Sequence, residues 1–518
     1  MFGSGGRSLP VRRSRRTGLP GGSGRLDGPG AGATYGARHI CRLKWLSVTY
    51  FDLAIIGSGS GNSLITPYWD GKKVAIIDGG TFGGTCLNVG CIPTKMFVYP
   101  AQLASAAKEA ASLGVDMAVK DVRWQELRDR VFGRIDAISE GGRRYRDEEL
   151  DNVTLYPEYA KFTGPKTLVT ASGQSIEAEH IVIAAGSRAH LPDVPGIDLP
   201  QVHTSDTVMR IDQLPARVLI VGGGFIAAEF AAVFSGFGCE VTQINRSAPL
   251  LKSEDRIVSE RFTAAAAAQW NLKLGWTLSR IEESGPGVRA TIAGTDGGEA
   301  VVDADIVLVA TGRLTNADSL DVEAAGFDLE EDGRLAVDEF QRVLAGGSPA
   351  EGIWALGDVS SPYQLKHVAN HEARVVTHNL ERPEDLRRSD HQFVPSAVFT
   401  RPQIASIGLT EEQARQDAEV SGAQIVTVIQ EYGTTAYGWA MEDATGFVKL
   451  IADKATGRLL GAHIMGHEAS ILIQPLIQAM SFGLDAYTMA RGQYWIHPAL
   501  TEVVENALLA LGTDAPST

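Results

Sequence analysis

Residues 51–62 read FDLAIIGSGSGN, an apolar run followed by glycines at alternate positions, and a second apolar run at 74–77 ends in Asp78. In a dinucleotide-binding unit, Gly57 permits the tight turn, Gly59 lets the backbone approach a pyrophosphate, and an acid further on bonds a ribose. Asp78 follows Gly57 by 21 residues. The stretch therefore predicts a strand, a glycine turn, a helix and a second, parallel strand.

A second copy of the pattern lies at residues 217–229, which read RVLIVGGGFIAAE. Gly222 and Gly224 hold the two glycine positions, and Ala227 holds the third, small position. The first copy has Asn62 at its third position, so we expect its helix and strand to pack less closely. Two copies predict two dinucleotide-binding folds in one chain.

The strand predicted after the second turn ends at Asn245-Arg246, without the acid that would hold the ribose 2′-hydroxyl of NAD. Arg246, together with Lys252, could instead grip a 2′-phosphate, which favours NADPH. An exposed loop charge without a ligand is the alternative interpretation of Arg246. The economical assignment places FAD in the first fold and NADPH in the second.

Two cysteines follow the first fold, in residues 83–95, which read GGTCLNVGCIPTK. Cys86 and Cys91 lie five positions apart, behind a glycine turn and ahead of an amphipathic segment. A thiol in the first turn of a helix is favoured as the thiolate, so the pair could form and exchange a redox-active disulfide. Two buried thiols without a role remain the alternative at this point.

The composition excludes several classes of protein. A chain of 518 residues predicts roughly three or four domains, and its 57 glycines suit an α/β protein rich in tight turns. Four cysteines exclude a disulfide-stapled secreted scaffold and favour a reducing compartment, so we predict a cytoplasmic protein. The net charge is −15 although residues 1–50 carry +8, which leaves −23 on the remainder and argues against binding nucleic acid or an anionic membrane.

Residues 1–48 are rich in Gly, Arg and Pro and lack both an apolar period and the apolar core of a secretory signal. Their acid-poor composition resembles a transit peptide, but the glycines and prolines would break its helix, so we predict a disordered extension. The longest apolar run, residues 218–239, is interrupted by three consecutive glycines at 222–224 and by Glu229. A strand, a turn and a buried helix explain this run better than a membrane span.

Three further strand ends carry residues that could contact a cofactor. The apolar runs at 181–185 and 306–310 are followed by Gly186 and Gly312, and the stretch at 354–358 ends in Asp358. An aspartate at a strand end can hydrogen-bond the sugar-alcohol chain of a flavin. Glycines that serve chain crossings and an ordinary turn aspartate are the structural alternatives.

Beyond a charged linker at residues 381–388, the pattern changes to a final domain. It predicts short strands at 398–405 and 447–451 and helices at 471–480 and 501–511.

The chemically informative stretch of this domain is YWIHPALTE at residues 494–502. His497 precedes Glu502 by five residues, so the carboxylate could fix the imidazole tautomer and favour imidazolium. The alternative is a histidine that only precedes a proline at a helix start.

The order of these motifs resembles that of the pyridine nucleotide-disulfide oxidoreductases, which include glutathione reductase and dihydrolipoamide dehydrogenase. The resemblance runs from residue 49 to about 511 and rests on the cysteine block, both dinucleotide patterns, ATGR at 310–313, GD at 357–358 and HPxxxE at 497–502. Within the family, residues 365–374 and 490–498 are most similar to the mycothione reductases.

The resemblance implies an α/β fold with two Rossmann-like dinucleotide-binding domains and a C-terminal α+β dimerisation domain, and hence a homodimer. The implied segments are an FAD-binding domain at 49–190 and 317–391, an NADPH-binding domain at 191–316 and a dimerisation domain at 392–518. We predict no metal site.

Carried over by position, the resemblance implies that electrons pass from NADPH through FAD to a Cys86–Cys91 disulfide. Cys91 would face the flavin, and Cys86 would attack the disulfide substrate. His497, oriented by Glu502 and donated by the partner subunit, would supply protons.

The remaining site residues are implied in the same way. Lys95 and Glu229 match a pair near flavin N5, and Phe225 takes the position of an aromatic gate over the nicotinamide. The implied FAD contacts are Gly57, Gly59, Asp78, Thr85, Lys95, Gly186, Glu229 and Asp358. The implied NADPH contacts are Gly222, Gly224, Ala227, Arg246, Lys252 and Gly312.

These inferences predict NADPH-dependent reduction of a low-molecular-weight disulfide, and the resemblance alone specifies mycothione. The alternatives are dihydrolipoamide dehydrogenase, which Arg246 disfavours, glutathione reductase, and a soluble flavin transhydrogenase or flavoprotein scaffold whose thiols are incidental. Mercuric reductase and high-molecular-weight thioredoxin reductase need further reactive residues near the C-terminus, where residues 512–518 contain no cysteine.

Overall fold

The computed structural model describes residues 48–512. The predicted extension at 1–48 lies outside the described residues except for Val48, and so do residues 513–518. Among the helices within 48–512, none is long and apolar enough to cross a membrane.

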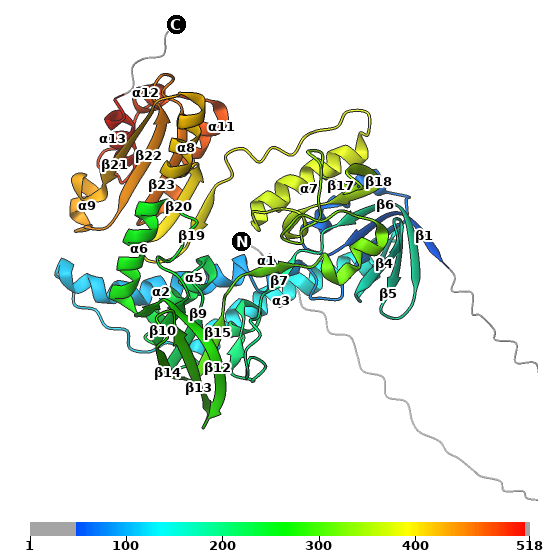
Figure 1. Ribbon diagram of the computed structural model, residues 1–518, viewed down its shortest axis with the longest axis horizontal. Helices are drawn as coiled ribbons and strands as arrows, with labels where there is room; N and C mark the ends of the chain where they lie inside the picture. Colours follow the sequence, from blue (N-terminus) through cyan, green and yellow to red (C-terminus); the bar gives the residue numbers. More distant parts are fainter. Residues whose placement is uncertain (1–47, 513–518) are drawn as a thin grey trace, which may run out of the picture. The chain divides into compact units, whose positions relative to one another are not determined.

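The first glycine turn follows an inner strand of an eight-stranded sheet (Figure 1). As predicted, β1 (Thr49–Ile56) pairs in parallel with β2 (Val74–Ile77), and on its other side it pairs with β6 (Ser175–Ile183). Alternate side chains of β1 point to opposite faces, so Ile55 enters one hydrophobic core and Ile56 another. Burial on both faces explains the uninterrupted apolar run. The other strands of this sheet are β3 (Val153–Tyr156), β4 (Ala160–Gly164), β5 (Thr167–Thr170), β17 (Arg342–Ala345) and β18 (Ser348–Ala355).

The prediction of an α-helix after the first turn is wrong. Two short 3-10 helices take its place, η1 (Gly61–Leu64) and η2 (Pro67–Trp69). Pro67 lacks the amide hydrogen that the interior of an α-helix needs, and Gly71, at a φ of 77°, turns the chain back toward β2. The first fold therefore has the strands and turn of a dinucleotide-binding unit without its usual helix.

Longer helices follow other strands of this sheet. Ala373 and Val376, on the helix after β18, share a core with Ile55 of β1, so this helix covers one face of the sheet. These helices are α1 (Gly84–Asn88), α2 (Cys91–Ala110) and α3 (Trp124–Glu148) after β2, and α7 (Lys366–Glu381) after β18.

The second glycine turn lies in a five-stranded parallel sheet. β9 (Arg217–Val221) leads into the turn and α5 (Phe225–Gly236) leads out of it, so the apolar run at 218–239 is a strand and a buried helix, as predicted. The neighbours of β9 are β10 (Glu240–Asn245) and β15 (Ile306–Val309). The same region contains β8 (Val202–His203), α4 (Ser205–Val208), α6 (Arg256–Gln269), β11 (Asn271–Leu274), β12 (Trp276–Ser284), β13 (Gly287–Gly294) and β14 (Glu299–Ala304).

The last part of the chain contains a five-stranded antiparallel sheet. The strand predicted at 398–405 is wrong in extent. β19 (Ser396–Val398) and β20 (Gln403–Gly408) are separated by a turn that contains Pro402, which has no amide hydrogen for a strand ladder.

The helix predicted at 471–480 is two helices, α10 (Ala469–Leu472) and α11 (Gln474–Phe482), because Pro475 lies in the first turn of a new helix. The helix predicted at 501–511 is α13 (Glu502–Ala510). The remaining elements are α8 (Glu411–Ser421), β21 (Ile425–Glu431), α9 (Ala436–Ala440), β22 (Phe447–Asp453), β23 (Leu459–Gly466) and α12 (Ala486–Arg491).

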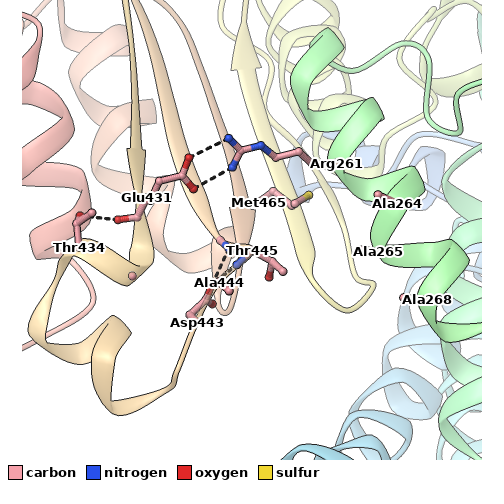
Figure 2. Close-up of a pocket in the computed structure, with 12 residues that line it drawn as sticks. Arg261, Ala264, Ala265, Ala268, Glu431, Thr434, Asp443, Ala444, Thr445 and Met465 are labelled. Carbon is pink, nitrogen blue, oxygen red and sulfur yellow. Dashed lines mark hydrogen bonds and ion pairs between the residues drawn. The ribbon is translucent and has the colours of Figure 1, made fainter.

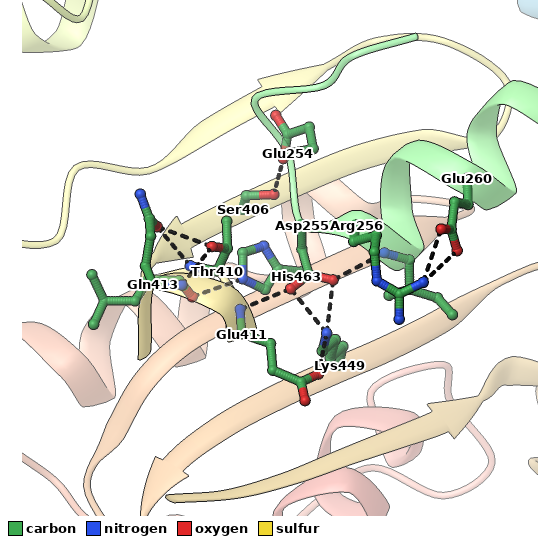
Figure 3. Close-up of polar contacts among 12 residues, drawn as sticks. Glu254, Asp255, Arg256, Glu260, Ser406, Thr410, Glu411, Gln413, Lys449 and His463 are labelled. Atoms are coloured by element: carbon green, nitrogen blue, oxygen red, sulfur yellow. Dashed lines mark hydrogen bonds and ion pairs between the residues drawn. The ribbon is translucent and has the colours of Figure 1, made fainter. Parts of the chain in front are cut away.

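A buried ion cluster joins α6 to this C-terminal sheet (Figure 3). The Lys449 ammonium lies 2.7 and 2.9 Å from the two carboxylate oxygens of Asp255 and 2.7 Å from Glu411. Asp255 also accepts the amide hydrogen of Ile257 and thereby caps α6. Lys449 and Asp255 are both buried, so the loss of either charge would leave the other uncompensated.

We therefore expect Lys449→Met to lower the free energy of unfolding by about 3–5 kcal/mol, because Asp255 would remain as a buried, unpaired carboxylate. Urea unfolding followed by far-ultraviolet circular dichroism measures this change. Lys454→Met is the matched control, since Lys454 is exposed in the turn directly after the same strand. Equal losses in the two variants would contradict the proposed importance of the cluster.

Candidate active site

The two cysteines lie beside the first glycine turn. Cys86 is in α1 and Cys91 is the first residue of α2. Gly84 has a φ of 71°, and a Cβ added to it would lie 2.7 Å from the Cα of Gly59, so the two glycines allow the cysteine turn and the first turn to touch. The amide of Gly83 also donates to the hydroxyl of Ser58 at 2.9 Å. The structure therefore brings the thiols next to the predicted pyrophosphate turn.

The environments of the two thiols differ. Both cysteines are free, and a hydrogen bond joins them. This bond, helped by the nearby Lys95 ammonium, lowers the pKa of Cys91 to about 7, whereas it raises the pKa of Cys86. Cys91 is thus the thiol that carries the negative charge, as expected for a cysteine that opens a helix.

Lys95 lies one helical turn after Cys91 and pairs with Glu229 of α5. Its ammonium is 2.7 Å from each carboxylate oxygen of Glu229, which is 5% exposed. The backbone amide of Phe399 donates to the same carboxylate at 2.9 Å, and the Phe399 ring lies 4.3 Å from the ammonium. The pair that the resemblance implied is therefore formed, and it ties the thiol helix to the second fold.

The first turn has the backbone that the pattern predicts. Gly57 has a φ of 104°, and a Cβ there would overlap the carbonyl oxygen of Ala184 at 2.3 Å. Asp78 accepts hydrogen bonds from the amide and hydroxyl of Ser58 at 2.7 and 2.5 Å, and from the amide of Gly80 at 2.8 Å. Asp78 thus stabilises the turn by hydrogen bonds, and the remaining lone pairs of its carboxylate could accept hydrogen bonds from a ribose. The predicted ribose contact stays a prediction.

The strand ends near Asp358 are tied to one another. β7 (Ser187–Ala189) and β16 (Arg313–Thr315) form a two-stranded antiparallel ladder. The hydroxyl of Ser187 donates to Asp358 at 2.6 Å. Gly186 and Gly312, with φ values of 68° and 131°, precede the two strands and permit these chain crossings. Their contacts with cofactors stay predictions, as does that of Thr85, an exposed residue of α1.

The second turn is open where a pyrophosphate would approach. A Cβ added to Gly224 would have no heavy atom of the described residues within 4 Å, whereas Ala227 is fully buried in α5. Arg246 and Lys252 are exposed, and neither has a carboxylate within ion-pair distance among residues 48–512. Phe225, at the predicted gate, is 43% exposed. These residues fit an anionic dinucleotide because they leave two cations available beside the turn.

His497 and Glu502 form the predicted pair. The imidazole Nδ1 lies 2.7 Å from a Glu502 carboxylate oxygen, and the His497 side chain is 72% exposed while that of Glu502 is 19% exposed. Within the described part of the chain, neither thiol hydrogen-bonds to His497. The Glu502 carboxylate therefore orients the His497 ring, and the ring lies on the surface of its own chain.

A cavity of about 770 Å³ lies apart from all these residues, between α6 and the C-terminal sheet (Figure 2). Arg261 and Glu431 form a two-bond ion pair beside it at 2.8 and 2.9 Å. Its lining contains none of the predicted site residues, so we place the chemistry at the thiols and not in this cavity.

The chain matches the family model described as pyridine nucleotide-disulphide oxidoreductase over residues 51–373 and the model of that family's dimerisation domain over residues 394–508. The chain belongs to this family. It is 53% identical over 473 residues to mycothione reductase of Mycobacterium tuberculosis (strain ATCC 25618 / H37Rv), a match that covers 89% of this chain and 99% of the relative. It is 32% identical over 440 residues to mercuric reductase of Lysinibacillus sphaericus, with coverage of 84% and 78%.

A solved structure, the HOCl-induced flavoprotein disulfide reductase RclA from Escherichia coli, is similar with a TM-score of 0.76 and 28% identity. This match covers 89% of the present chain and 99% of that chain. Membership of the family confirms the predicted fold class and enzyme class, a flavoprotein disulfide reductase with a pyridine nucleotide. The dimerisation domain is confirmed as well, whereas the domain boundaries and the cytoplasmic location stay predictions.

Some residues of the site were not predicted. Ser58 and Phe399 contact Asp78 and Glu229, and Lys366 reaches the first turn from α7. Lys366 and Phe399 make contacts across more than 100 residues, which no local pattern reveals. Ser58 could have been noticed, because it lies inside the glycine pattern.

We expect Lys95→Met to raise the pKa of Cys91, because a neighbouring positive charge stabilises the thiolate. The thiolate of the unaltered protein should form as the pH rises through about 7, and in the variant this midpoint should move up by about one pH unit or more. A pH titration of the long-wavelength thiolate–flavin absorbance of the two-electron-reduced protein measures it.

Lys95→Arg should keep most of the effect of the charge, and Lys108→Met, at an exposed position further along α2, is the matched control. An unchanged midpoint in Lys95→Met would show that the ammonium does not stabilise the thiolate.

Proposed function

We propose that this chain is an NADPH-dependent flavoprotein reductase that converts mycothione to mycothiol, with FAD in the first fold and NADPH in the second. The observation that carries the substrate is the 53% identity to mycothione reductase over 99% of that relative. The thiol pair beside the first turn supports the reaction type. Arg246 and Lys252, which have no carboxylate partner within residues 48–512, support NADPH over NADH.

The bound cofactors would supply the two electrons that open the Cys86–Cys91 disulfide. With its proton removed, Cys86 attacks one sulfur of the substrate disulfide, which forms a mixed disulfide and releases one thiol. The Cys91 thiolate then attacks the Cys86 sulfur, which restores the Cys86–Cys91 disulfide and releases the second thiol. One disulfide is reduced to two thiols for each cysteine pair oxidised.

His497 handles the protons of these steps. It accepts the proton of Cys86 and returns it to the leaving thiolate, and Glu502 holds its ring in place through the contact at Nδ1. Because His497 is exposed and has no contact with its own thiols, we assign it to the thiols of the partner subunit in a homodimer.

A steady-state comparison of mycothione, glutathione disulfide and lipoamide, each with NADPH and NADH, tests this function. We expect the highest kcat/KM for mycothione with NADPH. A preference for lipoamide with NADH would identify a dihydrolipoamide dehydrogenase and overturn the assignment. Cys86→Ser should abolish turnover, and NADPH-driven activity retained in that variant would indicate a flavoprotein whose thiols are incidental.

Mixed dimers test the donation of His497. When Cys86→Ser and His497→Ala subunits are combined in equal amounts, half of the dimers should contain one of each. If the histidine acts in the partner's site, each mixed dimer has one intact site, and the mixture recovers about a quarter of the unaltered activity. If the histidine acts within its own chain, every site lacks one residue and the mixture stays inactive.

A further inference from the structure

The first glycine turn lacks the feature that usually neutralises a pyrophosphate. In most dinucleotide folds the turn leads into an α-helix, whose free amide groups and dipole bind the phosphates. Here the turn leads into η1 and η2, which have four and three residues. The second turn leads into α5, which has 12 residues. The first fold must therefore obtain its positive charge from another source.

Lys366 supplies one charge. It is the first residue of α7, and its ammonium donates to the hydroxyl of Ser60, inside the first turn, at 2.7 Å across 306 residues. The side chain is half-buried, and no carboxylate within residues 48–512 lies at ion-pair distance from it. Two of its three hydrogen-bond donors remain unused by the contact with Ser60.

Arg146 supplies a second charge. From α3 it donates to the side-chain oxygen of Asn62 at 2.8 Å and to the Asn62 carbonyl at 3.2 Å. It too is half-buried, and the described residues offer it no carboxylate partner. Asn62, which departs from the usual small residue, thus holds an arginine at the turn.

We propose that Lys366 and Arg146 bind the pyrophosphate of FAD and replace the helix N-terminus that this turn lacks. The inference rests on the proposed function only in placing FAD in the first fold. Two cations match the two negative charges of a pyrophosphate, and both side-chain types bind phosphate oxygens by charge-assisted hydrogen bonds. Half-buried cations without a counter-ion are costly, and an anionic ligand at the turn removes that cost.

The test measures how tightly the holoenzyme holds FAD, from the fluorescence of flavin released on dilution. Lys366→Met and Arg146→Met should each weaken FAD binding about 10- to 100-fold, the range for one hydrogen bond to a charged group. Lys366→Arg and Arg146→Lys should restore most of the affinity. Lys161→Met is the matched control, because Lys161 is an exposed lysine that pairs with Asp321.

Affinities within twofold of the unaltered protein would overturn the inference. The Lys366 charge also partly opposes the rise in the pKa of Cys86. A Lys366→Met variant with unchanged FAD affinity and a changed pH dependence of the thiols would therefore assign the lysine to the thiol instead. If Lys366→Met does not fold, as judged by circular dichroism, Lys366→Gln replaces it. Absence of FAD from the unaltered protein would contradict the proposed function itself, whereas bound FAD with unaffected variants contradicts only this inference.

Discussion

The pairing of Lys95 with Glu229 is the interaction on which the site depends. Glu229 is buried in α5, where an unpaired carboxylate would be strongly disfavoured. Its counter-ion comes from α2, and its remaining hydrogen bond comes from the backbone of Phe399. Three separate segments must therefore meet for the charge to be tolerated. Because Cys91 lies one turn before Lys95, this requirement also fixes the thiols at the junction of the two folds.

The same arrangement explains why two chemically identical thiols could take different roles. Cys91 has a helix start, a hydrogen bond and the Lys95 ammonium to stabilise its thiolate, and a stabilised thiolate is a good leaving group but a weaker nucleophile. Cys86 has a raised pKa and needs a base, but it becomes the stronger nucleophile once deprotonated. The distinction follows from the start of α2 and the contact between the thiols, and it does not require different residue types.

Local patterns predicted the parts of the fold that local physics determines. The apolar runs of β1, β2 and β9 and both glycine turns were found because parallel strands are buried on both faces and positive φ angles favour glycine. The errors occurred at prolines: Pro67 prevents the helix after the first turn, and Pro402 divides a predicted strand. Contacts such as Lys449 with Asp255, across 194 residues, have no local signature at all.

The two glycine turns differ in where their positive charge comes from, because a helix follows the second turn and only short 3-10 helices follow the first. At the second turn, α5 provides amide groups locally, and Arg246 and Lys252 are exposed and have no carboxylate partner among residues 48–512. At the first turn, the short 3-10 helices cannot do so, and the charge reaches Ser60 and Asn62 from α7 and α3. Lys366 and Arg146 are half-buried and have no carboxylate partner within residues 48–512, so an anion bound between them would stabilise the folded state. If FAD binds at this turn as we propose, its binding is coupled to the packing of α3 and α7 against the first fold, and the cofactor then contributes to the stability of that fold.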